Sequence, residues 1–418
     1  MTRYLVYTPP SPGHVFPLVP GLLALSARGH HVAVRTAPDL VATLREAGLD
    51  AAPIDPRIVA ARRPSPGAAT PDKPGDLMGL APVERDDIAS AIAQTRAQAL
   101  LVDAITYGAA THAEASGLPW ALTMPSVLPM PGRHIPPYGL GLVRRTDLAG
   151  RLRDRALWPL VERIFARSML PGLNAVRAES GLRALRSPLD PLDRPDGVLV
   201  LTQEPLEYPR SDLPTHVEIV GAQVWDPPTE QPGWLDEPGD PWVLVTCSTD
   251  YQADEALARA AVEALRDEPV RVLLTLADAY DSATLPAASN VRVERFVPHA
   301  AVLPHAAVVV STAGMGIVQK AMAFGVPVVA VPFGRDQPEI ARRVQSAGLG
   351  VRLPVRRLTP DRLRDAVRAA RAMSSQVRAV AATVDPAANA LRFAEAAERL
   401  STDVGRSSSS GPPVAPVV

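Results

Sequence analysis

The 418-residue chain has little of three residue types that often carry function. Cys247 is its single cysteine, which excludes an internal disulfide and a cysteine-rich metal site and fits a reducing cytoplasm. Aromatic residues make up only 4% and hydrophobic residues 47%, as expected for an aliphatic α/β core. Of the 43 lysines and arginines, only Lys73 and Lys320 are lysines. Each lysine therefore merits separate consideration.

The chain also lacks an excess of charge of one sign and long apolar runs. Its 43 basic and 44 acidic residues give a formal net charge of −1, so no overall field would attract nucleic acid or an anionic membrane. The start of the sequence has no basic segment followed by an apolar one, and no stretch is long and apolar enough to cross a bilayer. We therefore expect a cytoplasmic protein without a membrane span or a nucleic-acid partner.

The length favours two domains of about 200 residues, because single cores stop growing beyond roughly 250 to 300 residues. The chain opens with an apolar run at 3–10, a Pro/Gly loop at 11–17, an amphipathic stretch at 18–29 and another apolar run at 30–37. This order predicts strand, loop, helix and strand, a unit whose strands pair in parallel through a right-handed crossover. Further apolar runs continue the alternation, so a doubly wound sheet is expected.

Proline-rich segments mark the connections. Residues 55–83 and 124–142 predict irregular loops, whereas 146–180 has the apolar spacing of a helix. The proline-dense segment 225–241 separates two alternating α/β regions, so the fold class is expected to be α/β with two facing doubly wound, Rossmann-like parallel sheets. The expected parts are an N-terminal domain at 1–222, a linker at 223–240, a C-terminal domain at 241–384, a helix at 385–400 packing back onto the first domain, and a disordered tail at 401–418.

One segment of the second region, 308–337, has the features of a diphosphate site. It reads as an apolar strand, a small-residue turn with Gly314 and Gly316, a helix, another strand, and the pair Asp336 and Gln337. A helix N-terminus offers free backbone N–H groups and a partial positive charge, which suit a diphosphate, although such a turn can equally serve close packing. The Asp-Gln pair could then hydrogen-bond the hydroxyls of an attached sugar.

This segment resembles the donor-binding signature of family 1 GT-B glycosyltransferases, in which a strand, an HGG-like turn, a helix, a GVP triplet and a DQ pair follow in this order. The loop at 13–32 is also similar to the opening of that family, and the closest resemblance is to actinobacterial enzymes that decorate natural products such as antibiotics. The resemblance implies a GT-B fold with the acceptor in the first domain and the nucleotide sugar in the second. It implies inverting transfer of a (deoxy)sugar from a UDP- or dTDP-sugar to a hydroxyl of a small hydrophobic acceptor.

The resemblance also places a catalytic base at His14 and its partner at Asp103. His14 follows the first expected strand, and imidazole titrates near neutrality, so it can take a hydroxyl proton as the acceptor oxygen attacks the anomeric carbon. Asp103 follows another strand of the same sheet and could fix the imidazole tautomer. The alternatives are an exposed loop histidine and an aspartate that caps a turn.

Other donor contacts follow from the resemblance. In family members the segment matching Arg295, Phe296 and Val297 lies against the nucleobase, although Phe296 could equally be a core residue. Ser248 and Thr249, after the first strand of the second region, match positions near the donor phosphate and sugar. The turn and the helix of the signature supply the remaining candidates, which are Thr312, Ala313, Gly314, Met315, Gly316, Ile317 and Lys320.

The chain departs from the family pattern within this turn and helix. The family usually has His at Thr312, Gly at Ala313 and Thr or Ser at Ile317, and each lost hydrogen bond to a charged group is worth about 1.5 to 3 kcal/mol. Lys320 stands where a glutamate commonly binds the ribose. Our hypothesis is that its ammonium group supplies charge to the pyrophosphate or the ribose, and the alternative is a solvated helix lysine.

No metal and no organic cofactor is expected, since the sequence has no DxD motif, no HExxH motif and no His/Cys cluster. Dipoles and hydroxyls would then stabilise the leaving group. The main alternative is a catalytically silent homologue that binds a partner, motivated by Thr312 and Ile317 and opposed by His14 and Asp103. A nucleotide-sugar epimerase would have a more polar cleft. A homodimer or a helper protein stays open.

Overall fold

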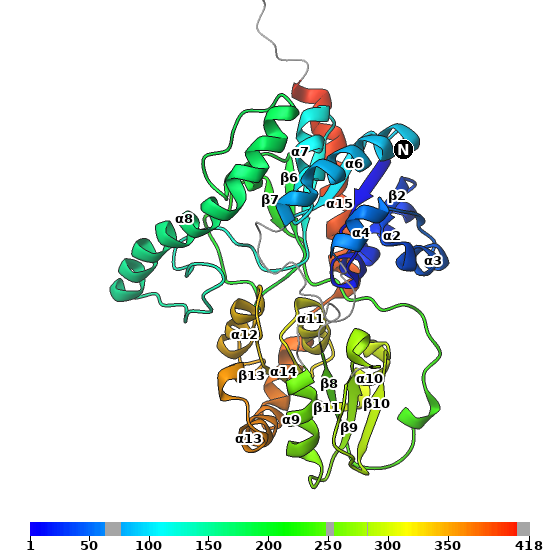
Figure 1. Cartoon of the computed structure of the whole chain (residues 1–418), viewed down its shortest axis with the longest axis vertical. Helices are drawn as coiled ribbons and strands as arrows, with labels where there is room; N and C mark the ends of the chain where they lie inside the picture. Colours follow the sequence, from blue (N-terminus) through cyan, green and yellow to red (C-terminus); the bar gives the residue numbers. More distant parts are fainter. Residues whose placement is uncertain (63–76, 248–254, 282, 408–418) are drawn as a thin grey trace, which may run out of the picture.

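The structure is a computed structural model of the chain and describes residues 1–62, 77–247, 255–281 and 283–407. It contains two separate sheets in which every strand pairing is parallel, and the sheets lie one above the other in Figure 1. Each sheet has an apolar core cluster on both of its faces. The predicted α/β architecture of two doubly wound sheets is therefore confirmed.

The upper sheet in Figure 1 has seven strands in the order β3-β2-β1-β4-β5-β6-β7. Its strands are β1 (Arg3–Tyr7), β2 (His31–Thr36), β3 (Asp50–Pro53), β4 (Ala99–Asp103), β5 (Trp120–Met124), β6 (Gly197–Val200) and β7 (Val217–Ile219). Its α-helices are α1 (Pro12–Val15), α2 (Val19–Ala27), α3 (Pro38–Glu46), α4 (Pro56–Arg62), α6 (Ala81–Thr95), α7 (Tyr107–Ser116) and α8 (Leu148–Glu179). The short 3-10 helices are η1 (Phe16–Leu18), η2 (Met78–Leu80) and η3 (Asp190–Asp193).

The lower sheet has six strands in the order β10-β9-β8-β11-β12-β13. Its strands are β8 (Trp242–Thr246), β9 (Arg271–Thr275), β10 (Val291–Glu294), β11 (Ala306–Ser311), β12 (Val328–Ala330) and β13 (Gly350–Arg352). Its α-helices are α9 (Glu255–Leu265), α10 (His299–Val302), α11 (Met315–Ala323), α12 (Gln337–Ser346), α13 (Pro360–Arg371) and α14 (Ser374–Ala381). The 3-10 helices are η4 (Gly233–Leu235), η5 (Ala277–Ala279), η6 (Leu303–His305) and η7 (Val355–Arg357).

Successive side chains of a strand point to opposite faces of its sheet, and here both faces are buried. Val6 of β1 belongs to the core cluster that includes α2, whereas Leu5 belongs to the cluster that includes α6. The parallel register places Leu5 opposite Ala33 of β2 and opposite Leu100 of β4. Strands buried on both faces read as continuous apolar runs, which explains why the sequence reveals them so readily.

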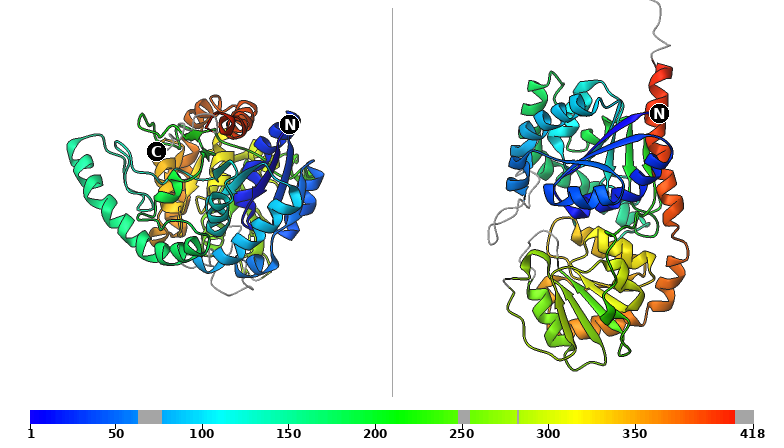
Figure 2. Two further views of the ribbon diagram at one scale, coloured as in Figure 1. Left: turned by 90° about the horizontal axis from the view of Figure 1, so that it is seen from above. Right: turned by 90° about the vertical axis from the view of Figure 1, so that its right-hand side faces the viewer.

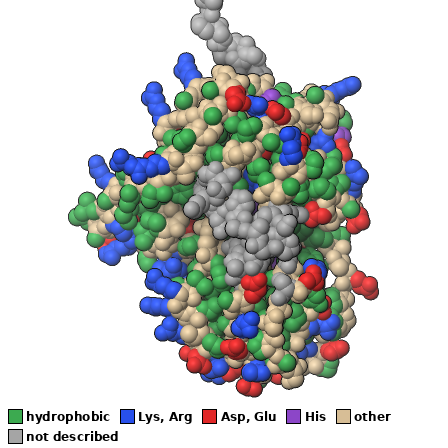
Figure 3. Space-filling model, viewed as in Figure 1, with side chains coloured by type: hydrophobic (Ala, Val, Ile, Leu, Met, Phe, Trp, Pro, Cys, Tyr) green, Lys and Arg blue, Asp and Glu red, His purple; other side chains and the backbone are tan. Residues whose placement is uncertain are grey.

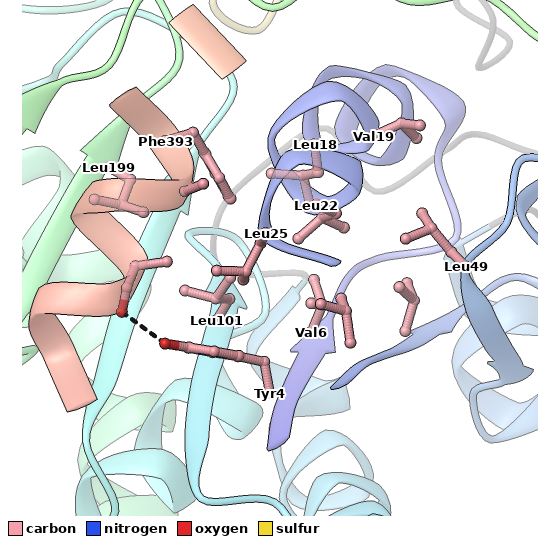
Figure 4. Close-up of a cluster of buried hydrophobic side chains, with 14 of the residues drawn as sticks. Tyr4, Val6, Leu18, Val19, Leu22, Leu25, Leu49, Leu101, Leu199 and Phe393 are labelled. Atoms are coloured by element: carbon pink, nitrogen blue, oxygen red, sulfur yellow. Dashed lines mark hydrogen bonds between the residues drawn. The ribbon is translucent and has the colours of Figure 1, made fainter. Parts of the chain in front are cut away.

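The last helix, α15 (Pro386–Ser407), leaves the lower part of the molecule and packs on the upper sheet (Figure 2). Phe393 is fully buried beside Leu22 and Leu25 of α2, and Tyr4 of β1 donates a hydrogen bond to the Ala397 carbonyl at 3.1 Å (Figure 4). A Cβ atom at Gly21 would collide with the Phe393 ring, so the contact requires glycine there. The burial of this apolar face is what holds the end of the chain on the first sheet.

Two segments differ from the sequence predictions. The predicted loop at 55–83 contains α4 and the start of α6, each of which has a proline in its first turn, where the missing N–H group costs no hydrogen bond. Residues 63–76 of that loop lie outside the described residues. The last helix continues to Ser407, past the predicted end at residue 400, because residues 401–407 contain no proline to stop it. Residues 408–418 also lie outside the described residues.

The surface in Figure 3 carries acidic and basic side chains of both signs across one face, in keeping with the net charge of −1. Among the helices of the described residues, none is long and apolar enough to cross a membrane. The chain passes between the two sheets twice, once after β7 and once between α14 and α15. The loops at the facing ends of the sheets are therefore brought together, and these loops form the site described next.

Candidate active site

Each sheet has a topological switch point, where the connections from two adjacent strands lead to strands on opposite sides of the sheet. These points lie between β1 and β4 in the first sheet and between β8 and β11 in the second. Ligands of open parallel sheets bind outside the carboxyl ends of the strands at such points. A cleft of about 1010 Å³ opens there and is lined by residues that follow β1, β4 and β5 on one side and β8, β9 and β11 on the other.

His14 and Asp103 meet in the first half of this cleft. His14 lies in α1, just after β1, and Asp103 is the last residue of β4, the neighbouring strand. The Nδ1 atom of His14 lies 2.9 Å from Oδ2 of Asp103, which is fully buried, whereas the histidine side chain is 27% exposed and lines the cleft. The other oxygen, Oδ1, accepts the Ile105 backbone N–H at 3.0 Å. The carboxylate is therefore fixed by two partners on different sides.

This geometry determines how the imidazole can act. A carboxylate beside Nδ1 favours the tautomer with the proton on that nitrogen, which makes Nε2 the basic nitrogen. The carboxylate would also stabilise the imidazolium that forms when Nε2 takes up a proton. The structure brings the two predicted residues together in the arrangement that general-base chemistry needs.

The turn after β11 forms an open backbone cradle in the second half of the cleft. Ala313 has φ +68°, a left-handed conformation that favours glycine, and its N–H donates to Ser311 Oγ at 3.2 Å. Gly314 is the N-cap of α11, and no side chain of the described residues caps this helix. A Cβ atom at Gly314 or Gly316 would have no atom of the described part of the chain within 4 Å. The helix N-terminus is thus open to the cleft, as a diphosphate would require.

The Asp-Gln pair lies at the start of α12 on the same wall. Asp336 Oδ2 accepts a hydrogen bond from Ser126 Oγ at 2.7 Å, so the carboxylate is linked to the loop that follows β5 in the first sheet. Gln337 Oε1 accepts the backbone N–H groups of Phe333 at 2.8 Å and Gly334 at 3.1 Å. Gln337 therefore holds the turn with its carbonyl end, while both residues line the cleft.

Most of the other predicted donor residues line the cleft as well. Phe296 is 54% exposed, which excludes the core position that its type also allowed, and Arg295 lies beside it with its guanidinium 5.0 Å from the centre of the Tyr280 ring. The members of the turn and helix that line the cleft are Thr312, Gly314, Met315, Gly316, Ile317 and Lys320.

Two predicted residues do not reach the cleft, because the sheet core takes their side chains. Val297 and Ala313 are buried in the apolar cluster that includes β11 and α11, and neither lines the cleft. Ser248 and Thr249 lie outside the described residues. Among the described residues, no group of three His, Cys, Asp or Glu side chains is placed to hold a metal ion.

Comparison with known proteins identifies the family. A family model described as "Erythromycin biosynthesis protein CIII-like, C-terminal domain" matches residues 260–398. The chain is 34% identical over 386 residues to 4'-demethylrebeccamycin synthase of Lentzea aerocolonigenes, an alignment that covers 88% of this chain and 91% of that protein. The chain belongs to the GT-B glycosyltransferases of natural-product biosynthesis.

Other relatives of this glycosyltransferase agree. It is 38% identical over 128 residues to demethyllactenocin mycarosyltransferase of Streptomyces fradiae, covering 30% of this chain and 28% of that one. The solved structure of the glycotransferase of kitacinnamycin covers 96% of this chain and 99% of its own, with a TM-score of 0.75 and 24% identity. The solved structure of glycosyltransferase VinC in complex with dTDP covers 95% of this chain and 100% of its own, with a TM-score of 0.64 and 22% identity. At these identities, the two structures show the shared fold.

Lys320 of the glycosyltransferase is not a solvated helix lysine. Its Nζ forms an ion pair with Oδ1 of Asp226, and both side chains are largely buried in the wall of the cleft. Asp226 Oδ2 also accepts the Ala300 N–H at 2.8 Å. His299 lies in the same group, and burial, aided by the Lys320 charge, lowers the pKa of its imidazole to about 4. The carboxylate of Asp226 is thus the counterion of Lys320 within the protein.

Sequence reasoning missed several residues that line the cleft. Asp226 and Trp225 lie in the proline-dense segment that reads as a linker, and Trp225 packs edge-on against Phe16 with ring centres 5.1 Å apart. Ser126 lies in a loop whose composition indicates only irregular structure. Arg62 ends α4, a helix that the sequence does not reveal. Partners distant in the sequence make these residues part of the site, so no local signal could have identified them.

Proposed function

We propose that this glycosyltransferase moves a hexose from a UDP- or dTDP-sugar to a hydroxyl of a small hydrophobic acceptor, with inversion at the anomeric carbon. The observation that carries the proposal is that one cleft is lined by His14 of the first sheet, which the buried Asp103 holds from behind, and by the N-terminus of α11 from the second. The first feature suits a base, and the second suits a diphosphate.

The reaction proposed is a single displacement. His14 Nε2 takes the proton of the acceptor hydroxyl as the oxygen forms a bond to the anomeric carbon. The bond from this carbon to the diphosphate oxygen breaks, and the diphosphate leaves with the electron pair. Attack from the side opposite to the leaving group inverts the anomeric centre, and Asp103 stabilises the imidazolium. Docking of both substrates between the sheets supplies the alignment.

The leaving group is proposed to be stabilised without a metal or another cofactor. Backbone N–H groups in the first turn of α11 and the partial positive charge of that terminus face the developing charge, together with the Thr312 hydroxyl. We assign Asp336 and Gln337 to the sugar hydroxyls and Arg295 and Phe296 to the nucleobase, and their position in the lining of the cleft supports this. The relative VinC was solved with dTDP, which favours a thymidine donor.

The wall on the first-sheet side favours an apolar acceptor. It is formed by β5, by the loop that follows it and by the long helix α8. The apolar side chains that line the cleft there are Leu122, Met124, Val127, Trp158, Val161, Phe165 and Met169. A flat aromatic or macrocyclic hydroxyl compound would bury its apolar surface against them.

The test is transfer from dTDP-α-glucose and UDP-α-glucose to a panel of phenolic aglycones in buffer with EDTA, with the product analysed by NMR. We expect a β-linked glucoside, and we expect His14→Gln to lower kcat by about 10² to 10⁴. His31→Gln is the matched control, because His31 is a half-exposed histidine on β2 outside the cleft. An α-linked product, or full activity of His14→Gln, would contradict the proposal.

A further inference from the structure

Arg62, at the end of α4, is a buried cation in the wall of the cleft on the acceptor side. Its side chain is only 8% exposed. Its Nη2 atom donates to Glu84 Oε1 and to the Ile105 carbonyl, each at 2.8 Å. Among the described residues, neither the buried Nε nor Nη1 has a hydrogen-bond partner. Two of the three guanidinium nitrogens therefore have no acceptor within the part of the chain that the structure describes.

The side of the guanidinium that is bonded is held rigidly. Glu84, on α6, is fully buried, and its Oε2 accepts the Gly108 N–H at 3.0 Å. A Cβ atom at Gly108 would overlap the Ala81 carbonyl, so α6 and α7 are in direct backbone contact at this point. Burial raises the pKa of the Glu84 carboxyl, and the Arg62 charge opposes that rise. The guanidinium is thus held through Nη2, whereas Nε and Nη1 have no acceptor among the described residues.

The same arginine is joined to the proposed catalytic pair through a single residue. Ile105 gives its carbonyl to Arg62 and its N–H to Asp103, whose other oxygen holds His14. Arg62 also lies close enough to Tyr107 to counteract the rise in the pKa of that phenol, which burial brings to about 12. Tyr107 and Leu77 belong to one apolar cluster and line the cleft. Arg62 therefore lines the same cleft as these apolar side chains and His14.

We propose that Arg62 is an acceptor-recognition residue that binds a neutral carbonyl oxygen of the aglycone and so presents a hydroxyl of the same ring system to His14. This inference rests on the proposed function. An unpaired buried donor is costly, and a ligand oxygen would satisfy it. Glu84 and Asp103 already place two carboxyl groups near this point, so a carbonyl fits better than a carboxylate, which would meet charge of its own sign.

The experiment compares two probes that differ in carbonyl groups alone, 2-hydroxyanthraquinone and 2-hydroxyanthracene, by fluorescence titration in the presence of dTDP. Wild type is expected to bind the quinone at least about tenfold more tightly, the usual value of a hydrogen bond to a charged group. Arg62→Met should bring this ratio close to one. Arg57→Met, on the same helix with a 70% exposed side chain, is the matched control and should keep the ratio.

Arg62→Met leaves Glu84 without its partner, so the double variant Arg62→Met with Glu84→Gln is tested beside it. The glutamine can still accept the Gly108 N–H, and this variant should also lose the preference. A wild type without preference, or an Arg62→Met variant that keeps it, would overturn the inference. Tighter binding of anthraquinone-2-carboxylate than of the quinone would overturn it in favour of a charged acceptor.

Calorimetric titration with dTDP and UDP, run on the same samples, separates this inference from the proposed function. If wild type binds neither nucleotide, the proposed function fails whatever the probe ratio is. If nucleotide binding is intact in wild type and in Arg62→Met while the probe ratio does not change, only the role of Arg62 fails.

Discussion

Asp103 illustrates how much a single buried side chain organises in this site. Its carboxylate meets His14 on one oxygen and the Ile105 N–H on the other, and its backbone carbonyl accepts a hydrogen bond from Thr106 at 2.7 Å. An aspartate that only capped the turn would not need the histidine, and the histidine alone would have no fixed tautomer. The contact between the two side chains accounts for both positions at once, which is why we propose general-base chemistry for this half of the cleft.

His299 gives a prediction for the dependence of stability on pH. Its folded-state pKa is lowered to about 4 by burial, with Lys320 nearby, whereas an unfolded chain has the ordinary value of about 6.5. Between these values the unfolded chain binds a proton that the folded protein does not. The free energy of unfolding should therefore fall by about 1 to 3 kcal/mol as the pH drops from 6.5 to 4, with no contribution above that range.

The measurement is urea denaturation of wild type and His299→Asn at pH 7.5 and pH 4.5. The variant should lose a smaller part of its stability on acidification than wild type, because its amide does not titrate. Equal losses in the two proteins would show that His299 stays accessible to protons in the folded state.

At the scale of single residues, the sequence revealed residue types better than partners. The positions of His14, Asp103 and the α11 turn follow from motifs near strand ends, and the structure brings them to one cleft. The sequence could not reveal that Lys320 pairs with Asp226, because 94 residues separate them and only the folded linker brings them together. Arg62 stayed hidden for the same reason, since its partner Glu84 lies on another helix.

Among the elements, α15 makes the most specific contact, and its removal should be costly. Phe393 is fully buried between α15 and α2, and Phe393→Ala is expected to lower the free energy of unfolding by about 3 to 5 kcal/mol. Leu391 is a matched control on the same helix, because it is 48% exposed and its replacement by alanine should change stability by less than about 0.5 kcal/mol. Urea denaturation measures both, and similar losses in the two variants would contradict this packing.

The elements that the sequence predicts well are those with an unambiguous pattern. Central strands such as β4 and β8 are buried on two faces and appear as apolar runs, and α8 follows the predicted helix at 146–180 closely. The short α4 was missed, because a starting proline and a run of prolines after it resemble a loop. The end of α15 was placed too early, since serine and glycine after residue 400 suggested disorder where the helix continues.

At the scale of the molecule, a buried ionic group joins the two halves. Arg343 of α12 reaches Glu207, from the segment after β6, at 2.7 Å and Glu339 at 3.1 Å, with all three side chains about 1% exposed or less. Its guanidinium also lies 4.1 Å from the centre of the Tyr208 ring. The sequence placed these residues in different domains and offered no sign of the contact.

Arg343→Met should remove the cation that pairs with two buried carboxylates, those of Glu207 and Glu339, and lower the free energy of unfolding by about 3 to 5 kcal/mol. Arg356→Met, at an exposed arginine of η7, serves as the control and should have almost no effect. Chemical denaturation followed by circular dichroism distinguishes them. A loss below about 1 kcal/mol for Arg343→Met would mean that the two halves are held together by other contacts.

The central claim is that the open N-terminus of α11 binds the diphosphate of a nucleotide sugar, and calorimetric titration of dTDP and UDP in EDTA tests it most directly. A Cβ atom at Gly314 would meet no atom of the described residues within 4 Å, and Gly314 lines the cleft, so Gly314→Leu should fold normally and block the site. Gly233→Leu, at a linker position with equal space outside the cleft, is the matched control. The account predicts micromolar binding of one nucleotide by wild type and the control, weakened at least about tenfold in Gly314→Leu. Equal binding by all three proteins, or none by wild type, would contradict it.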